Sequence, residues 1–299
     1  MSTGRASSCA TRSGIRYTRQ PDGGPVLNPT LSGLLSAATY GLGDFLSGLA
    51  SRRDPPLRVV ALTHPLSAVA MLLLAWGLGQ PLPAVAELLW GAAAGLAGLI
   101  AVLAFYRALA LGPMGVVSVG AGALSALVPV VVGVFGGEVL GVWGWLGAVG
   151  ILAGTALLGW PAAGETSGRG VPLGLLAGVG FGVFFVLLAQ AQGGGVFWVL
   201  GAARVASSLV AVPLAAATVG LRPRGPGLIL ASAPGDTLGN VFYLLAVQGG
   251  PLAVGALLTS LYPAITTLLA VSVLREQLRA PQWVGVVLSL GGAALLARP

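Results

Sequence analysis

Ten apolar segments of about 20 residues follow one another along the chain, separated by short breaks rich in glycine, proline and arginine. Each segment is long enough to cross the roughly 30 Å hydrocarbon core of a bilayer as an α-helix. Since only 8% of the residues are charged and 56% are hydrophobic, polar side chains are too few to coat a soluble fold. The expected all-α membrane segments are 30–50, 57–79, 86–110, 114–135, 141–159, 171–191, 196–219, 228–248, 252–274 and 281–297.

The polar residues exclude several classes of protein. The net charge of +7 comes from arginine, but no basic face interleaved with aromatic residues favours a nucleic-acid partner. Cys9 and His64 are the only residues of their types, which excludes a disulfide framework and a two-histidine zinc site. No nucleophile-elbow motif accompanies His64. We therefore expect neither an enzyme nor a resident metal or cofactor.

Residues 1–29 are polar, rich in arginine and serine, and precede the first apolar segment. Their composition is similar to that of a transit peptide. We favour a flexible tail, or a start placed too far upstream, over that interpretation.

The second half of the chain repeats the first, which divides it into units at 30–160 and 171–297. Shifting the sequence by 137 to 141 positions superimposes similar segments in the same order. Because five helices per unit is an odd number, the second unit enters the membrane from the opposite side. The units are then inverted repeats around a central site. Matching residues are Glu138/Glu276, Trp145/Trp283, Phe105-Tyr106/Phe242-Tyr243, Gly41/Gly182, His64/Arg204 and Ser67/Ser207.

An aromatic pair in the third segment of each unit, with a glutamate after the fourth, resembles the EamA family of the drug/metabolite transporter superfamily. The resemblance implies ten transmembrane helices in two inverted five-helix repeats, a central cavity, and secondary transport of metabolites such as amino acids, or of drugs, with export the expected direction. Gly43-Asp44-Phe45 resembles a bacterial subgroup, which implies a multi-pass protein of the bacterial inner membrane. Further residues that carry the resemblance are Phe105-Tyr106-Arg107-Ala108-Leu109, Gly137-Glu138, Phe242-Tyr243-Leu244-Leu245-Ala246, Ser260-Leu261-Tyr262-Pro263-Ala264, Glu276-Gln277-Leu278 and Ser51-Arg52-Arg53.

Other interpretations stay open. The chain also fits a nucleotide-sugar or lipid-linked-sugar translocator of the same superfamily, or, from another class, a membrane-embedded enzyme or receptor. Because it has no nucleotide-binding motif, we expect a carrier driven by a proton or substrate gradient. Its expected partners are a small-molecule substrate, protons and the lipid bilayer, and it would act as a monomer or a homodimer.

Ionisable residues inside a membrane segment are costly and by default indicate a functional site. Asp44 and His64 lie at similar depths in consecutive segments and could pair, either as part of a site or as a structural hydrogen bond. Arg204 and Asp236 lie near the middle of antiparallel segments, where they could form a substrate or coupling site or a structural ion pair. Asn240 lies one helical turn after Asp236, so it extends a polar stripe.

Three other positions have weaker claims. Tyr262-Pro263 predicts a helix kink, and Tyr262 is a candidate lining residue. Arg107 lies near a segment end and is expected to reach the interface, whereas Glu138 is expected to be solvated or to cap a helix. We expect the cavity to be lined by segments one to four and six to nine, with the fifth and tenth at the periphery.

Overall fold

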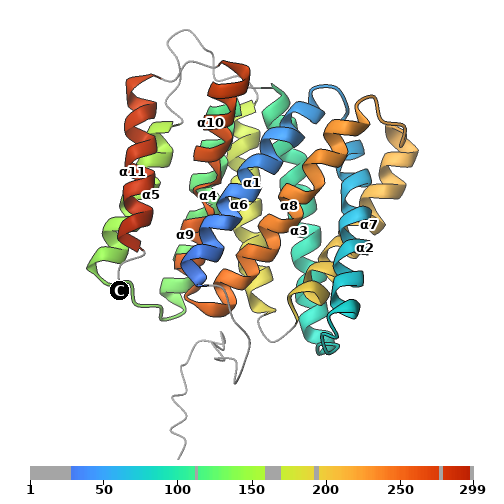
Figure 1. The fold of residues 1–299 in the computed structure, drawn as a ribbon, viewed down its shortest axis with the longest axis horizontal. Helices are drawn as coiled ribbons and strands as arrows, with labels where there is room; N and C mark the ends of the chain where they lie inside the picture. Colours follow the sequence, from blue (N-terminus) through green and yellow to red (C-terminus); the bar gives the residue numbers. More distant parts are fainter. Residues whose placement is uncertain (1–27, 112–113, 159–169, 192–194, 276–278, 297–299) are drawn as a thin grey trace, which may run out of the picture.

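The computed structural model describes residues 28–111, 114–158, 170–191, 195–275 and 279–296 (Figure 1). These residues form α-helices joined by short loops, and they contain no strand. The helices are α1 (Pro29–Ser51), α2 (Pro56–Gly77), α3 (Val85–Leu111), α4 (Met114–Phe135), α5 (Val142–Leu158), α6 (Gly170–Gln190), α7 (Val196–Thr218), α8 (Pro226–Gly249), α9 (Leu252–Thr259), α10 (Tyr262–Leu274) and α11 (Ala280–Leu296).

Every apolar segment expected from the sequence is helical, with outer ends within two residues of the expected ones. Within the described residues, seven stretches are long and apolar enough to cross a membrane. They lie in α2, α3, α4, α6, α7, α8 and the line formed by α9 and α10. A shorter apolar stretch, Val142–Gly154, lies in α5. The 23-residue α1 is also long enough, but it carries Asp44 and four serines. Most of the expected tail, and Glu276, lie outside the described residues.

The ninth expected segment is broken into α9 and α10 at Ser260 and Leu261. Pro263 follows the break and has no N–H to donate to a carbonyl one turn back, which interrupts the helix as expected. The Pro263 ring also packs closely against α4 at Gly122, where any side chain would clash. A methyl group on Gly122 would lie 2.4 Å from Pro263 Cγ. Proline alone does not decide this break, because α4 contains Pro129 and continues through it.

The sequence repeat is visible in how the helices pack, because α1 lies along α8 and α6 lies along α3 (Figure 1). A methyl group on Gly235 of α8 would lie 2.5 Å from Gly43 Cα of α1. Likewise, a methyl group on Gly98 of α3 would lie 2.9 Å from Phe184 Cδ2 of α6. Gly98 matches Gly235 and Gly43 matches Phe184 under the repeat. The same interhelical contact therefore occurs twice, once with each unit supplying the first helix.

The fifth helix of each unit lies at one edge of the bundle, where α5 and α11 pack mainly on each other (Figure 1). Their backbones approach closely, since a methyl group on Gly292 would lie 2.7 Å from the carbonyl oxygen of Gly147. At the other edge α2 packs along α7 (Figure 1). The remaining helices lie between these two pairs and enclose the polar interior.

Candidate functional site

A cavity lies between six helices, α1, α3, α6, α7, α8 and α10. Both units contribute, and no residue of α5 or α11 is among the described lining, as expected from the sequence. The expectation that the second and fourth segments line the cavity is wrong for the described lining, because α2 packs mainly on α7 and α4 mainly on α6. The lining residues are Tyr40, Asp44, Gly95, Gly98, Val102, Phe181, Phe184, Phe185, Leu200, Ala203, Arg204, Asp236, Asn240 and Tyr262.

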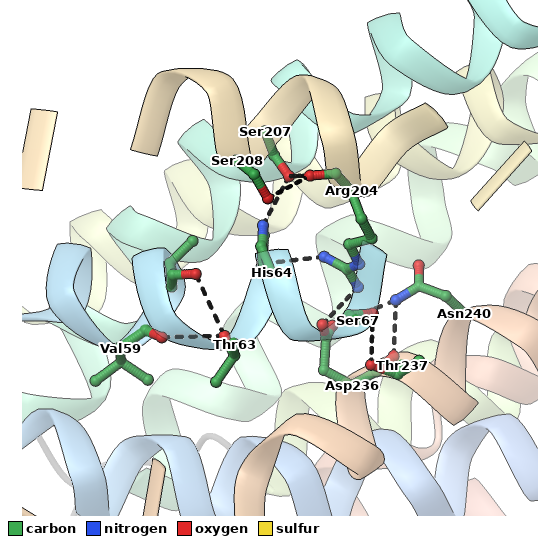
Figure 2. Close-up of polar contacts among 11 residues, drawn as sticks. Val59, Thr63, His64, Ser67, Arg204, Ser207, Ser208, Asp236, Thr237 and Asn240 are labelled. Carbon is green, nitrogen blue, oxygen red and sulfur yellow. Dashed lines mark hydrogen bonds and ion pairs between the residues drawn. The ribbon is translucent and has the colours of Figure 1, made fainter. Parts of the chain in front are cut away.

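Arg204 and Asp236 form an ion pair in the cavity wall, with 2.5 Å between Arg204 Nη2 and Asp236 Oδ2 (Figure 2). The side chains are 11% and 21% exposed, respectively. Asn240 lies one turn along α8 and donates from Nδ2 to the Asp236 carbonyl oxygen at 2.7 Å and to Oδ1 at 3.3 Å. The structure thus brings together the three residues whose depth and spacing predicted a polar stripe.

His64 contacts the other terminal nitrogen of Arg204. Its Nε2 lies 2.9 Å from Arg204 Nη1, and its Nδ1 lies 2.8 Å from Ser207 Oγ (Figure 2). A guanidinium can only donate, so Nε2 must be the acceptor and the ring must be neutral, with its proton on Nδ1. Nδ1–H then donates to Ser207 Oγ, which donates in turn to the Arg204 carbonyl oxygen at 3.1 Å.

His64 and Arg204 are matching residues of the two units, as are Ser67 and Ser207. Each unit therefore contributes its own copy of one position to a single contact. Two residues at matching positions of the units can be in contact only near the axis that relates one unit to the other. The His64–Arg204 hydrogen bond therefore lies where the two units meet symmetrically, near that axis.

Asp44 lies in the cavity wall, but it does not pair with His64. The expected pairing is wrong because α1 packs along α8 and only touches α2, so consecutive helices are not the closest neighbours here. The Asp44 side chain is buried, and within the described part of the chain no hydrogen bond or ion pair of its carboxylate is found. Asp44 instead shares the cavity with Arg204 and Asp236.

Five aromatic side chains form an apolar side of the cavity, which we call the aromatic wall. Tyr262 begins α10, just after the helix break, and its ring centroid lies 6.3 Å from that of Tyr40. Sequence reasoning found Tyr262 but missed the rings of α6, although the repeat carried the signal: Phe181 matches Tyr40, and Phe185 matches Asp44. The aromatic wall consists of Tyr40, Phe181, Phe184, Phe185 and Tyr262.

The sequence also gave no sign of the contact that joins the α1–α2 connection to the α7–α8 connection. Asp54 accepts hydrogen bonds from the backbone N–H groups of Arg224 (3.1 Å) and Gly225 (3.0 Å), and from Arg58 Nη1 (2.8 Å). Arg58 donates in turn to the carbonyl oxygens of Gly220 (2.8 Å) and Val219. We call this group of residues the Asp54 clasp.

The Asp54 carboxylate is held ionised by its contacts. Burial alone would raise the pKa of Asp54, but the hydrogen bonds from Arg58 and from the Arg224 and Gly225 N–H groups outweigh burial. The pKa of Asp54 therefore lies below its ordinary value.

On the other face of the bundle, where α1 begins, two further contacts join the units. Glu138 accepts hydrogen bonds from Leu252 N (2.8 Å) and Ala253 N (3.0 Å), so it caps the start of α9, one of the two roles expected for it. Gln80 accepts from Phe197 N (3.3 Å) through its side chain and from Trp198 Nε1 (3.0 Å) through its carbonyl oxygen.

Arg107, a weaker candidate, is exposed and does not line the cavity. Among the described residues no group of histidine, cysteine and acidic side chains could hold a metal ion. The chemistry available in the cavity is therefore ion pairing, hydrogen bonding and aromatic contact.

The sequence matches one family model twice: residues 29–160 and 168–298 both match the EamA-like transporter family. The fold is similar to that of a solved structure described only as "Crystal structure of protein", with a TM-score of 0.68 and 22% sequence identity over 90% of this chain and 96% of the other. At that identity the likeness shows a shared fold alone. Comparison with curated proteins gave no match.

Proposed function

The chain belongs to the EamA-like transporter family, whose model matches both of its units, and on that premise we propose that it is a secondary transporter that moves small molecules through the central cavity by alternating access. The observation that carries the proposal is the position of the cavity. It lies between the two units, and its wall holds the Arg204–Asp236 pair beside the contact of matching residues.

The proposal includes ten membrane crossings in two inverted units, with α9 and α10 counted as one broken crossing. Supporting it, α1 begins and α11 ends on the same face of the bundle, as an even number of crossings requires (Figure 1). The duplicated α1–α8 and α6–α3 contacts support a two-fold relation between the units.

Contacts between the units lie on both faces of the bundle. The Asp54 clasp lies on the face of the α1–α2 connection, whereas the Glu138 and Gln80 contacts lie on the face where α1 begins. Alternating access requires the contacts on one face to separate while the contacts on the other face stay formed. Polar contacts at the ends of the helices suit this task, because water can replace them when they break.

The proposed setting is the bacterial inner membrane, with export of metabolites such as amino acids, or of drugs, driven by a proton or substrate gradient. The resemblance of Gly43-Asp44-Phe45 and Ser51-Arg52-Arg53 to a bacterial subgroup supports the location. A sugar-nucleotide translocator would need free cationic groups for its phosphates. Arg204 is the one cationic residue of the described lining, and its charge is already paired with Asp236.

Reconstitution tests the proposal. Liposomes containing the purified protein are loaded with unlabelled solute, and entry of labelled solute is followed for a panel of amines, amino acids and drugs. A transporter gives saturable exchange of an unchanged solute, and Arg204→Ala weakens it. Chemical conversion of the solute would instead identify a membrane-embedded enzyme, and binding without exchange for every solute would contradict the proposal.

A further inference from the structure

The charges of the cavity do not balance. Its described lining contains three charged residues, Asp44, Arg204 and Asp236. Arg204 and Asp236 neutralise each other at 2.5 Å, which leaves Asp44 as the remaining charge-bearing group. A carboxyl group at this depth is costly unless it meets a partner, and the described residues supply none.

The other polar atoms without a partner are also suited to accept hydrogen bonds. The Asn240 amide directs its nitrogen to two oxygen atoms of Asp236, so its oxygen points away, and that buried Oδ1 has no partner (Figure 2). The Tyr40 and Tyr262 hydroxyls are likewise buried without a partner, and each can accept or donate. Both terminal nitrogens of Arg204 already donate, Nη1 to His64 and Nη2 to Asp236, and the charge of Arg204 is balanced by Asp236. A ligand that donates hydrogen bonds therefore suits the unpaired groups of the cavity best.

The aromatic wall favours the same kind of ligand. Aromatic rings attract a cation placed over their faces and bury apolar groups well. Tyr40 and Tyr262 lie 6.3 Å apart between ring centroids, and Tyr40 and Phe185 lie 6.2 Å apart, at steeply inclined angles. Such inclined rings present both faces and edges to one enclosed space.

From these observations, and resting on the proposed transport function, we infer that the cavity takes organic cations: a protonated amine pairs with Asp44 while its apolar body packs on the aromatic wall. Zwitterions fit less well, because their carboxylate would find Arg204 occupied by Asp236. Organic anions fit least, since Asp44 repels them. The inference narrows the broad class of metabolites and drugs to amines.

Three probes with the same phenylethyl body test this selectivity: phenethylamine, a cation at neutral pH; phenylalanine, a zwitterion; and 3-phenylpropanoate, an anion. Binding to the purified full chain is measured by isothermal titration and by the ligand-dependent shift of the thermal unfolding midpoint. The expected order of affinity is phenethylamine, then phenylalanine, then 3-phenylpropanoate. Equal or tighter binding of the zwitterion or the anion would overturn the inference.

Variants locate the site. Asp44→Asn is nearly isosteric and should weaken phenethylamine binding by about tenfold or more, because it removes a charge-assisted contact. Glu87→Gln, which neutralises a carboxylate in the first turn of α3 outside the described lining, is the matched control and should leave the affinity unchanged. Asp44→Asn should fold at least as stably as the parent, since it removes a buried carboxyl group that has no ion-pair partner among the described residues. An unchanged affinity in Asp44→Asn would refute the assignment.

Failure of the inference and failure of the proposed function give different results. Tight amine binding that depends on Asp44, without exchange in liposomes, supports the site and contradicts transport. Exchange of phenylalanine or 3-phenylpropanoate that is indifferent to Asp44 supports transport and contradicts the amine site. If phenethylamine, tryptamine and tetraethylammonium all fail to bind, the amine site is rejected whatever the liposomes show.

Discussion

Asp236 and Arg204 meet in the cavity wall, and each has a second polar partner, Asn240 and His64 respectively. Paired and hydrogen-bonded charges are the form in which ionised groups persist within a membrane bundle. The sequence left three roles for Asp236: a proton-coupling acid, half of a substrate clamp, or half of a structural lock. The observed ion pair favours the clamp and the lock, because both require the two charges to be in contact.

Asp236→Asn is expected to destabilise the protein, because it leaves the Arg204 guanidinium without its counter-ion. We expect a loss of at most about 3 kcal/mol, the lower end of the range for a broken buried pair, since the cavity leaves Asp236 partly exposed. The measurement is denaturant unfolding in detergent. Arg204→Gln combined with Asp236→Asn should recover most of the loss if the pair is a lock, and should fold but not transport if it is a clamp.

His64 is expected to act on Arg204 as a neutral acceptor. His64→Leu removes that acceptor and should cost about 1–3 kcal/mol, the penalty for a buried donor left without a partner. His64→Gln can offer its amide oxygen to Arg204 Nη1 and should cost less. Unfolding midpoints of the two variants, measured side by side, check the ranking. If His64→Leu were as stable as the parent, the hydrogen bond to Arg204 would contribute nothing.

Part of this site could be predicted from the sequence and part could not. Depth within antiparallel segments was enough to bring Arg204 to Asp236, and one-turn spacing was enough to add Asn240. The expected Asp44–His64 pair failed because adjacency in sequence does not fix which helices pack together. The rings of α6 were missed because phenylalanines in an apolar segment look like any other packing residues.

At the scale of helices, the Asp54 clasp joins two loops that are about 170 residues apart in the chain. Asp54 occupies the N-terminal end of α8, where free backbone N–H groups and the helix dipole favour a carboxylate. Arg58 meanwhile bonds the carbonyl oxygens of Val219 and Gly220 just beyond the end of α7. One acid–base pair therefore satisfies the ends of two helices in the other unit.

The clasp should weaken only in acid. A carboxylate whose pKa is lowered by folding stabilises the folded state above its unfolded pKa, and that contribution is lost as the pH falls through the folded value. The unfolding midpoint of the parent should therefore exceed that of Asp54→Asn at neutral pH, and the difference should vanish at a pH below the ordinary range of an aspartate. A difference that persists in strong acid would show that charge is not the stabilising feature.

Helix positions were predictable because bilayer-length apolar runs and the Gly, Pro and Arg breaks fix where each helix begins and ends. A kink at Tyr262-Pro263 was predictable, but a full break was not, because α2, α4, α7 and α8 each continue through an internal proline. The loop contacts of Asp54 were not, since neither Asp54 nor Arg224 has an unusual sequence context, and only packing of α1 along α8 brings their loops together.

At the scale of the whole molecule, alternating access predicts that contacts between the units separate at the two faces of the bundle but persist at its centre. The α2–α7 contact at His64 and Arg204 lies where the units meet symmetrically, so a rocking motion displaces it least. The clasp lies at a surface, far from that point, and must separate for the cavity to open on its side.

Cross-linking across the clasp should arrest transport. Cysteines at Arg53 and Gly225, in a chain carrying Cys9→Ser, suit a short reducible thiol linker, because a Cβ at Gly225 would lie 3.8 Å from Arg53 Cδ. We expect exchange in liposomes to fall to background after linking, to return after reduction, and ligand binding to persist. Each single-cysteine variant is the control. Unimpaired exchange in the linked protein would mean that this face does not open.

The meeting of His64 with Arg204 has a consequence for how such a molecule can be built. In a symmetric dimer of identical five-helix chains, a residue on the dyad faces its own copy. Two arginines there would repel, and neither could accept the other's hydrogen bond. Joining the halves into one polypeptide frees the two copies to differ, so that one becomes an acceptor and the other a donor. Covalent fusion thereby permits a complementary contact at the one location where self-association of identical chains forbids it.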